Sequence, residues 1–321
     1  MLQTALRRAM PWCFVLAAPL AAAGGAAPCL APQAQVAASP GDRSAAKAQA
    51  VDRGFLWRIE REGRVSWLYG AMHYGKADWM VPGPRLREAF SQSDVLALEI
   101  ELNDEAMAVL LATPAAAAMS RMLTPERRRR LARQVKAACL PAGALSSLRP
   151  VMQAATLTLM AARVEGLDAQ FGMESVLETA TRALGKPVAA LETAAQQLQA
   201  LTGGSEAEEI AYVDSLLDEL ESGQAHVQAG ELAGIWARSD WATLSDYRRW
   251  CDCVKTLADE NTLRRLLEAR NPGMADGIEK LHAKGQRVLA AVGALHMVGP
   301  QGLPALLAAR GFTVTPVLPA P

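Results

Sequence analysis

Apolar runs with strand character lie near both ends of the chain, and a long helical stretch separates them. The segment from Phe55 to Gly70 has two apolar runs around the turn-prone EREGR, which predicts a β-hairpin. DVLALEIEL, from Asp94 to Leu102, is an almost continuous apolar run and predicts a buried strand. Residues 287–292 and 312–317 predict two more strands, with a helix over 303–310 between them.

The middle of the chain, about residues 104–270, shows mainly helical periodicity. Thr124 followed by proline is typical of a helix start, and the apolar stretch 149–166 predicts a buried helix. A strand over 187–191 interrupts this region and closes on Glu192. We therefore predict an α+β fold, in which a central mixed sheet is built from N- and C-terminal αβ halves with a large helical insertion.

The first residues indicate export. Two arginines precede a short apolar run from Met10 to Ala23, which is the layout of a secretory signal peptide. We expect residues 1–23 to be this signal, residues 24–53 to form a flexible lead-in, and residues 54–321 to form a single domain. The lead-in is expected to be flexible because it is rich in Ala, Pro, Gly and Ser.

An exported chain would be periplasmic or secreted, without a membrane span after signal cleavage. A lipoprotein anchored at Cys29 fits less well, because Pro28 stands where a small residue is expected. Export also means an oxidising compartment, in which disulfides persist. Cys251 and Cys253 are too close in sequence for an easy mutual bridge, so we expect a bridge from Cys139 to one of them, or buried thiols. A metal or redox role for the Cys-x-Cys pair is the alternative.

Composition narrows the class of partner. Apolar residues make up 51% of the 321 residues, enough for a sizeable core. The 33 basic residues balance the 33 acidic ones, so we expect no nucleic-acid partner. The oligomeric state stays open.

Two of the four histidines stand in matching positions. His73 in YGAMHYG and His296 in VGALHMVG each follow a glycine by three residues at the end of a predicted strand. A glycine there lets the backbone turn sharply or approach a ligand, and a neutral imidazole binds metals or acts as a base near pH 7. If both halves share one sheet, both histidines reach its rim; the alternative is a pair of loop histidines that cap helices. His226 and His282 lack this setting, and we expect both on the surface.

Several charged residues are candidates for the same site. Glu99 lies in an apolar run, where a carboxylate needs a partner, whereas Glu101 is expected to be more exposed. Glu174 begins a predicted helix, where an acid also favours the helix dipole. We interpret Glu192 as a loop residue that accepts from backbone N–H groups. Arg270 precedes an Asn-Pro-Gly turn signature and can pair with buried carboxylates.

Taken together, these segments resemble the TraB/GumN family, whose animal relatives are the TIKI-type membrane metalloproteases. The resemblance runs from about Phe55 to Val317 and is carried by WLYGAMHYG, SDVLALEIEL, FGMESVLETATRALGKPVAALET, ARNPGMADGIEKL and VLAAVGALHMVG. The family's first motif usually reads Gly-Thr-x-His, but Ala71 replaces the threonine here. The resemblance implies a fold like that of erythromycin-esterase and ChaN-like proteins. It also implies a shared site made of the two Gly-x-x-His loops, Glu99, Glu174 and Arg270.

The resemblance further implies a metal-dependent hydrolase, because the TIKI-type relatives are described as metal-dependent peptidases. In this hypothesis His73 and His296 bind a divalent metal ion, Mn, Co or Zn, with Glu99 or Glu174 as the third ligand. The other carboxylate deprotonates the bound water, and Arg270 stabilises the oxyanion. The substrate would be a peptide or a small molecule.

Two alternatives stay open. In the first, His73 or His296 acts directly as a general base without a metal, as in an esterase-like hydrolase. In the second, the chain is a haem- or ligand-binding periplasmic protein, with Met72 and Met297 near the histidines as iron ligands. Core packing is the simpler interpretation of the two methionines.

Overall fold

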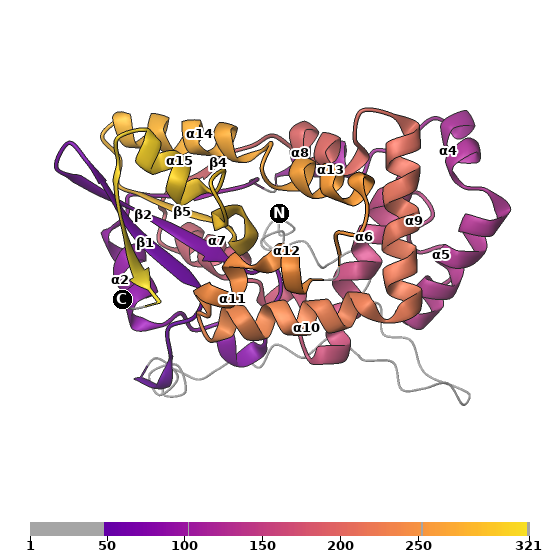
Figure 1. Ribbon diagram of the computed structural model, residues 1–321, viewed down its shortest axis with the longest axis horizontal. Helices are drawn as coiled ribbons and strands as arrows, with labels where there is room; N and C mark the ends of the chain where they lie inside the picture. The colour runs from indigo at the N-terminus through magenta and orange to yellow at the C-terminus, as the bar shows by residue number, and fades with distance from the viewer. Residues whose placement is uncertain (1–47, 102, 252, 320–321) are drawn as a thin grey trace, which may run out of the picture.

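Strands from both ends of the chain meet in one mixed sheet, with a helical bundle at one end of the molecule (Figure 1). The computed structural model describes residues 48–101, 103–251 and 253–319, so the expected signal peptide and most of the expected lead-in lie outside the described residues. The strands are β1 (Phe55–Arg61), β2 (Arg64–Ala71), β3 (Val95–Leu98), β4 (Val188–Ala190), β5 (Val288–Gly293) and β6 (Thr313–Leu318). Their order across the sheet is β4-β3-β5-β2-β1-β6. The first four strands in this order run parallel, and β1 is antiparallel to both β2 and β6.

The sheet confirms that the two ends of the chain fold together. The predicted hairpin is β1–β2, in which Phe55 pairs with Gly70. The C-terminal strand β5 lies between β3 and β2, and all of its residues are buried. An uninterrupted apolar strand is expected at such a central position, because neighbouring strands flank it on both sides and both of its faces are buried. The predicted α+β class, with a sheet assembled from two αβ halves, is therefore confirmed.

Helices fill the long connections between the strands. They are α2 (Pro84–Gln92), α3 (Asp104–Leu110), α4 (Ala116–Met122), α5 (Pro125–Ala137), α6 (Pro150–Ala161), α7 (Met173–Ala183), α8 (Ala194–Thr202), α9 (Glu206–Ser222), α10 (Gln224–Ala237), α11 (Trp241–Ser245), α12 (Tyr247–Trp250), α13 (Leu257–Leu266), α14 (Asn271–Ala283) and α15 (Leu303–Ala309). Short 3-10 turns lie at Ala77–Trp79, Ala162–Glu165, Ala169–Phe171 and Ala294–Met297. β4 divides the insertion into two parts, α3 to α7 and α8 to α14.

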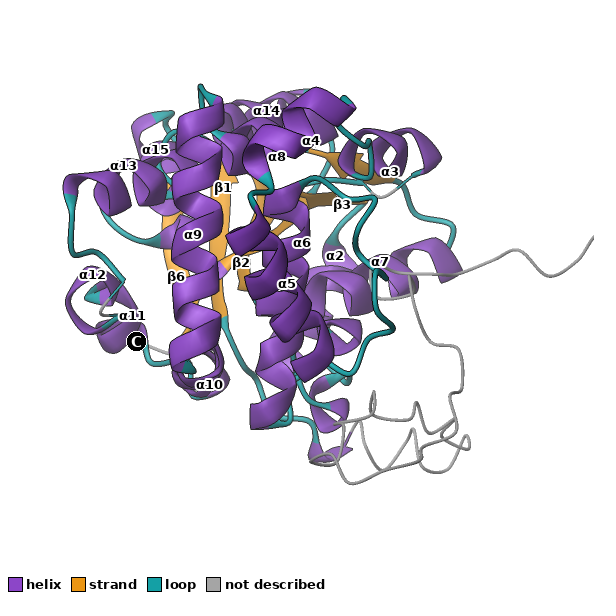
Figure 2. Cartoon of the chain, turned by 90° about the vertical axis from the view of Figure 1, so that its right-hand side faces the viewer, coloured by secondary structure: helices purple, strands orange, loops and turns teal. Residues whose placement is uncertain are grey.

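The helical insertion has a hydrophobic core of its own. Leu131, Leu157 and Leu217, from α5, α6 and α9, are buried together and apart from the core around the sheet. Figure 2 shows these three helices side by side in front of the sheet. The insertion is thus a bundle that packs on itself, so it can flank the sheet without becoming part of it.

Trp236 on α10 joins the two parts of the molecule. Its indole Nε1 donates to the carbonyl of Gly70 at 2.9 Å, and its own carbonyl accepts from the N–H of Gly54 at 2.9 Å. Gly54 has a φ of +78°, and a Cβ there would lie 2.7 Å from the indole nitrogen. A larger residue at position 54 would therefore separate α10 from the end of β2. This contact fixes the strand end that leads to His73.

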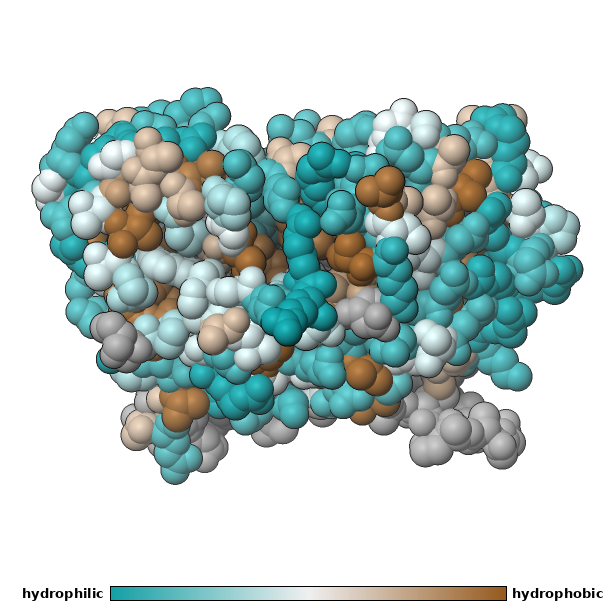
Figure 3. All heavy atoms as spheres, viewed as in Figure 1, coloured by the Kyte–Doolittle hydropathy of each residue, from teal (hydrophilic) through white to brown (hydrophobic). Residues whose placement is uncertain are grey.

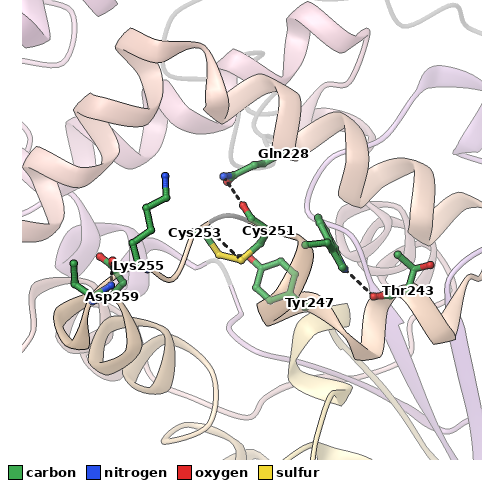
Figure 4. The surroundings of a disulfide bond; sticks show 9 residues. Gln228, Thr243, Tyr247, Cys251, Cys253, Lys255 and Asp259 are labelled. Atoms are coloured by element: carbon green, nitrogen blue, oxygen red, sulfur yellow. Dashed lines mark hydrogen bonds between the residues drawn. A yellow bond between two sulfur atoms is a disulfide. The ribbon is translucent and has the colours of Figure 1, made fainter.

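The disulfide pairing differs from the prediction. Cys251 and Cys253 bond to each other, so the expected bridge from Cys139 to this pair is wrong (Figure 4). The chain bends sharply after α12 and brings the two Cα atoms to 5.1 Å, within the range that a disulfide spans. The carbonyl of Cys251 accepts from Gln228 on α10, so the bend also rests on that helix.

One broad face of the molecule is mainly hydrophilic (Figure 3). The face seen in Figure 3 is largely polar, and its upper edge is notched between the sheet end and the helical end. Among the described residues the large exposed hydrophobics, including Val164, Leu184 and Leu257, are scattered along the chain. None of the described helices is both long and apolar enough to cross a membrane.

His282 is buried, so its predicted surface position is wrong. The side chain is 0% exposed in the last turn of α14. Its Nε2 donates to the carbonyl of Arg61, and the hydroxyl of Ser66 donates to its Nδ1. Ser66 in turn accepts from the N–H of Val288, so a chain of hydrogen bonds links α14 to β2 and β5. By contrast, His226 is partly exposed and pairs with Glu165.

We expect acid to destabilise the fold through His282. Burial lowers the pKa of His282 below its usual 6.5, so the native state disfavours the proton that the unfolded chain binds. Stability should therefore be lost as the pH falls below about 6.5, by up to about 1.4 kcal/mol per pH unit for this one group. Urea unfolding of His282→Gln between pH 7 and pH 5 should show a shallower decline than wild type. His282→Asn, which also lacks a titratable ring, is the matched control; equal slopes in all three proteins would contradict the expectation.

Candidate functional site

Four residues of the site follow the ends of four neighbouring parallel strands. His73 follows β2, Glu99 follows β3, Glu192 follows β4, and His296 follows β5. Parallel strands end at the same edge of a sheet, which is where such folds place functional groups. In Figure 1 the tips of β2 and β5 point toward the middle of the molecule, where the sheet meets the helical end. The four residues therefore share one edge, although 223 positions separate the first from the last.

Glycine allows the two Gly-x-x-His loops to pack closely. β2 and β5 are paired so that Gly70 lies opposite Val292 and Ala71 opposite Gly293. The N–H of Gly293 donates to Glu99 Oε1 at 2.8 Å. A Cβ on Gly293 would lie 3.2 Å from both Glu99 Oε1 and His73 Nε2. Glycine at this position thus keeps a space open between the carboxylate and the imidazole.

The strand expected over 94–102 is shorter than predicted. β3 ends at Leu98, so Glu99 lies directly after the strand and turns toward the site. It is 8% exposed. Glu101 lies outside the site and pairs with Arg182 on α7. The predicted difference in exposure is correct, since the Glu99 side chain is 10% exposed and the Glu101 side chain is 30% exposed.

Glu174 is held against His73 by backbone hydrogen bonds. The N–H of Met173 donates to the carbonyl of Met72, and Gly75 exchanges two hydrogen bonds with Asp168. These contacts place the first turn of α7 beside the His73 loop, and His73 Nδ1 lies 2.9 Å from Glu174 Oε1. Both Glu174 oxygens are buried, and neither has a well-aligned hydrogen bond among the described residues. The contact is therefore mainly a pairing of charges.

This pairing favours the imidazolium form of His73. The charge of Glu174 raises the pKa of His73 to about 9, against the opposing effect of burial. The His73 side chain is 57% exposed, so solvent weakens the attraction. The Nε2 of His73 lies 4.0 Å from Glu99 Oε1, which is too long for a direct hydrogen bond. An oxygen atom to one side of the line between the two groups can hydrogen-bond to both.

Arg270 is the residue before α14, and every nitrogen of its guanidinium contacts another group of the protein. Its Nε and Nη2 bind Glu192, and Nη2 also donates to Glu99 Oε2 at 2.6 Å. Its Nη1 donates to the carbonyl of Leu266 and faces His296 Nε2 at 3.3 Å. These contacts account for all five N–H donors of the group. Arg270 therefore pairs with buried carboxylates, as predicted, and has no N–H left for an oxyanion.

His296 is held in its neutral form. It is 3% exposed, and its Nδ1 lies 2.6 Å from Asn271 Oδ1, to which it donates. The other nitrogen, Nε2, then accepts from Arg270. Burial lowers the pKa of His296 to about 4. The two matched histidines thus have opposite charge preferences at neutral pH.

Glu99 stays ionised although it is buried. Burial by itself raises the pKa of this carboxyl, but His296, His73, Arg270 and the N–H of Gly293 together lower the pKa to about 2. An ionised carboxylate between two histidines and an arginine is a strong hydrogen-bond acceptor. It can hold the hydrogen of a water or of a substrate beside His73.

Two further site residues were not identified as such from the sequence. Glu192 binds Arg270 through both carboxylate oxygens, and Asn271 orients His296. Glu192 had a usable signal, since it ends the apolar segment VAALE in the same way that Glu99 ends VLALE. Asn271 had none, because an Asn-Pro-Gly sequence reads as a turn although it begins α14.

The described arrangement does not fit a metal ion held by His73, His296 and Glu99. A metal ligand needs a free lone pair. The Nε2 lone pair of His296 faces the Arg270 guanidinium, and its Nδ1 carries the hydrogen donated to Asn271. Among the residues that the structure describes, no three His, Cys, Asp or Glu side chains form a group that could hold a metal.

The charge states of the two histidines can be measured directly. In ¹⁵N NMR of the imidazoles we expect His296 to stay neutral, with hydrogen on Nδ1, from pH 8 down to pH 5. His73 should be cationic at pH 7 and lose its proton above its usual 6.5, toward about 9. His73→Gln and His296→Gln assign the signals. A His296 ring that titrates at 6.5 or above, or a His73 ring that is neutral at pH 7, would contradict this description.

Comparison with known proteins agrees with the resemblance seen in the sequence. No curated protein and no solved structure matches this chain significantly. The model of the TraB/PrgY/gumN family matches residues 55–316, from the first strand to the last, and spans both Gly-x-x-His loops. The chain therefore belongs to the TraB/PrgY/gumN family.

Proposed function

We propose that this protein is a hydrolase in which His73 activates water for attack on an amide or ester carbonyl. The observation that supports this most is the arrangement around His73. One ring nitrogen contacts Glu174 at 2.9 Å, and the other faces Glu99 across a 4.0 Å gap that Gly293 keeps open. A base oriented by one carboxylate, with a second carboxylate near enough to bind the same water, is the arrangement that general-base hydrolysis needs.

The reaction then proceeds through His73. A water between His73 and Glu99 donates one hydrogen to the Glu99 carboxylate and the other to His73 Nε2. His73 takes this second proton as the water oxygen attacks the carbonyl carbon. Glu174 stabilises the imidazolium that forms. His73 then gives the proton to the departing nitrogen or oxygen as the carbon–heteroatom bond breaks, which restores the neutral base.

The exposure of the groups supports this division of roles. His73 is the site group that solvent reaches, with 57% of its side chain exposed, whereas the Glu99 and His296 side chains are 10% and 4% exposed. A substrate would therefore meet His73 first, and the buried groups would hold it and the water in place. Peptides and small esters or amides are the substrates that we propose, outside the cytoplasm if the expected signal peptide acts.

A metal-dependent version of this chemistry is the competing hypothesis. Arg270 and Asn271 already engage both nitrogens of His296, which leaves this histidine no free lone pair for a metal. The haem-binding alternative lacks support from the methionines, since Met72 and Met297 are 4% and 2% exposed in the main core. Those side chains pack against the sheet, as the simpler interpretation held.

Hydrolysis of a panel of fluorogenic peptides, amides and esters tests the proposal. His73→Gln removes the base and should lower kcat by about 10²–10⁴-fold. Glu174→Gln removes the partner that orients the base and should lower kcat about tenfold or more. Gly293→Ala should lower kcat comparably to His73→Gln, because the methyl group fills the space for water. Glu101→Gln, whose carboxylate pairs with Arg182 outside the site, is the matched control and should keep wild-type rates. Circular dichroism checks that each variant is folded.

The same assay separates the two mechanisms. Activity should survive dialysis against a chelator, and kcat should rise with pH between 7 and 9 as His73 loses its proton. If activity disappears on chelation and returns with Mn²⁺, Co²⁺ or Zn²⁺, the metal hypothesis is correct and this proposal is not. Full activity of folded His73→Gln would equally exclude His73 as the base.

A further inference from the structure

We propose that the Arg270 guanidinium, which lies between Glu99, Glu192 and His296, occupies the position in which a divalent metal ion would otherwise bind. This inference concerns the buried side of the site and does not depend on hydrolysis. Removing the guanidinium should therefore uncover a metal site for transition-metal ions made of two carboxylates and one imidazole. The family resemblance implies a metal on His73, His296 and a glutamate, and Arg270 contacts His296 and Glu99 of that set.

The position of one guanidinium nitrogen carries the argument. Arg270 Nη2 lies 2.6 Å from Glu99 Oε2 and 2.5 Å from Glu192 Oε2. These distances are only a few tenths of an ångström longer than metal–carboxylate bonds, so a single ion at this point reaches both acids. The neighbouring Nη1 faces His296 Nε2 at 3.3 Å. The same guanidinium therefore contacts the imidazole as well as both carboxylates.

The surroundings already resemble the support that a metal site needs. Asn271 Oδ1 accepts from His296 Nδ1, which fixes the tautomer whose Nε2 lone pair points at Arg270. Asn271 is 1% exposed, and its amide is anchored to the carbonyls of Gln301 and His296. Metal-bound histidines are oriented through their second nitrogen in the same way. The protein uses this arrangement to receive a guanidinium.

The two buried carboxylates explain why a cation is needed at the position of the Arg270 guanidinium. Glu99 and Glu192 are 8% and 7% exposed. Two buried carboxylates so near each other lower the stability of the fold unless a cation lies between them. The Arg270 guanidinium contacts both carboxylates, and Glu192 binds it through both carboxylate oxygens. Glu192 is thus a positioning residue that holds Arg270 against Glu99 and His296. A divalent ion would balance the same two charges.

Metal titration of purified protein tests the proposal without any substrate. After chelator treatment, Co²⁺ is added, and its visible absorption and binding heat are recorded. Wild type should show no site-bound Co²⁺, whereas Arg270→Ala should bind about one equivalent. Arg270→Ala combined with Glu192→Gln, or with His296→Ala, should lose that binding. Arg270→Lys keeps a cation in place and should behave like wild type.

Free guanidinium gives an independent readout. Guanidinium chloride at millimolar, non-denaturing concentrations should compete with Co²⁺ for Arg270→Ala, and the same concentration of sodium chloride should not. An Arg270→Ala chain that folds only when Co²⁺ is present would also support the proposal.

Three results would overturn it. The first is stoichiometric Co²⁺ in wild type that His296→Ala removes. The second is a folded Arg270→Ala that binds no metal, and the third is binding by Arg270→Ala that the second substitutions leave unchanged. If Arg270→Ala does not fold under any condition, the wild-type titration decides. Because hydrolysis is not measured, these outcomes are separate from failure of the proposed function.

Discussion

The parallel pairing of β2 with β5 is the contact on which the rest of the site depends. It joins the second strand of the chain to the fifth, and it sets Ala71 opposite Gly293. With this register both Gly-x-x-His loops leave the sheet at the same edge and the same height. β5 also borders β3, so Glu99 arrives between the two histidines. A shift by one residue would turn each strand end to the other face of the sheet and separate the groups.

Buried charge is the second constraint, and it is met by pairing at every position. Glu174 lies against His73, and Glu99 and Glu192 share Arg270. His296 avoids charge altogether, because Asn271 and Arg270 bind its neutral form. The site therefore separates into an exposed part that can exchange a proton with solvent and a buried part that is fully paired. This division underlies both proposals, since the exposed part suits catalysis and the buried part fixes its geometry.

The helical insertion supports the site from outside the sheet. Trp236 of α10 binds the carbonyl of Gly70, and α7 supplies Glu174. The α13–α14 junction supplies Arg270 together with Asn271. The sheet thus provides the histidines and two carboxylates, and the inserted helices provide the groups that orient them. Substitutions in the insertion can therefore alter the site without touching the sheet.

The sequence by itself determined the hairpin, the strands at both ends, the helical middle and the two matched histidine loops. Each of these depends on local periodicity or on glycine at a strand end, which a single segment contains. It also singled out His73, Glu99, Glu174, Arg270 and His296, through repeated motifs, an acid in an apolar run and a family resemblance. Only the tertiary structure decided what surrounds these residues. The roles of Glu192 and Asn271, the burial of His282 and the Cys251–Cys253 disulfide depend on contacts between distant segments or on a sharp local bend, which periodicity does not encode. For the same reason the sequence could suggest metal ligands, but only the folded chain showed that Arg270 and Asn271 contact both ring nitrogens of His296.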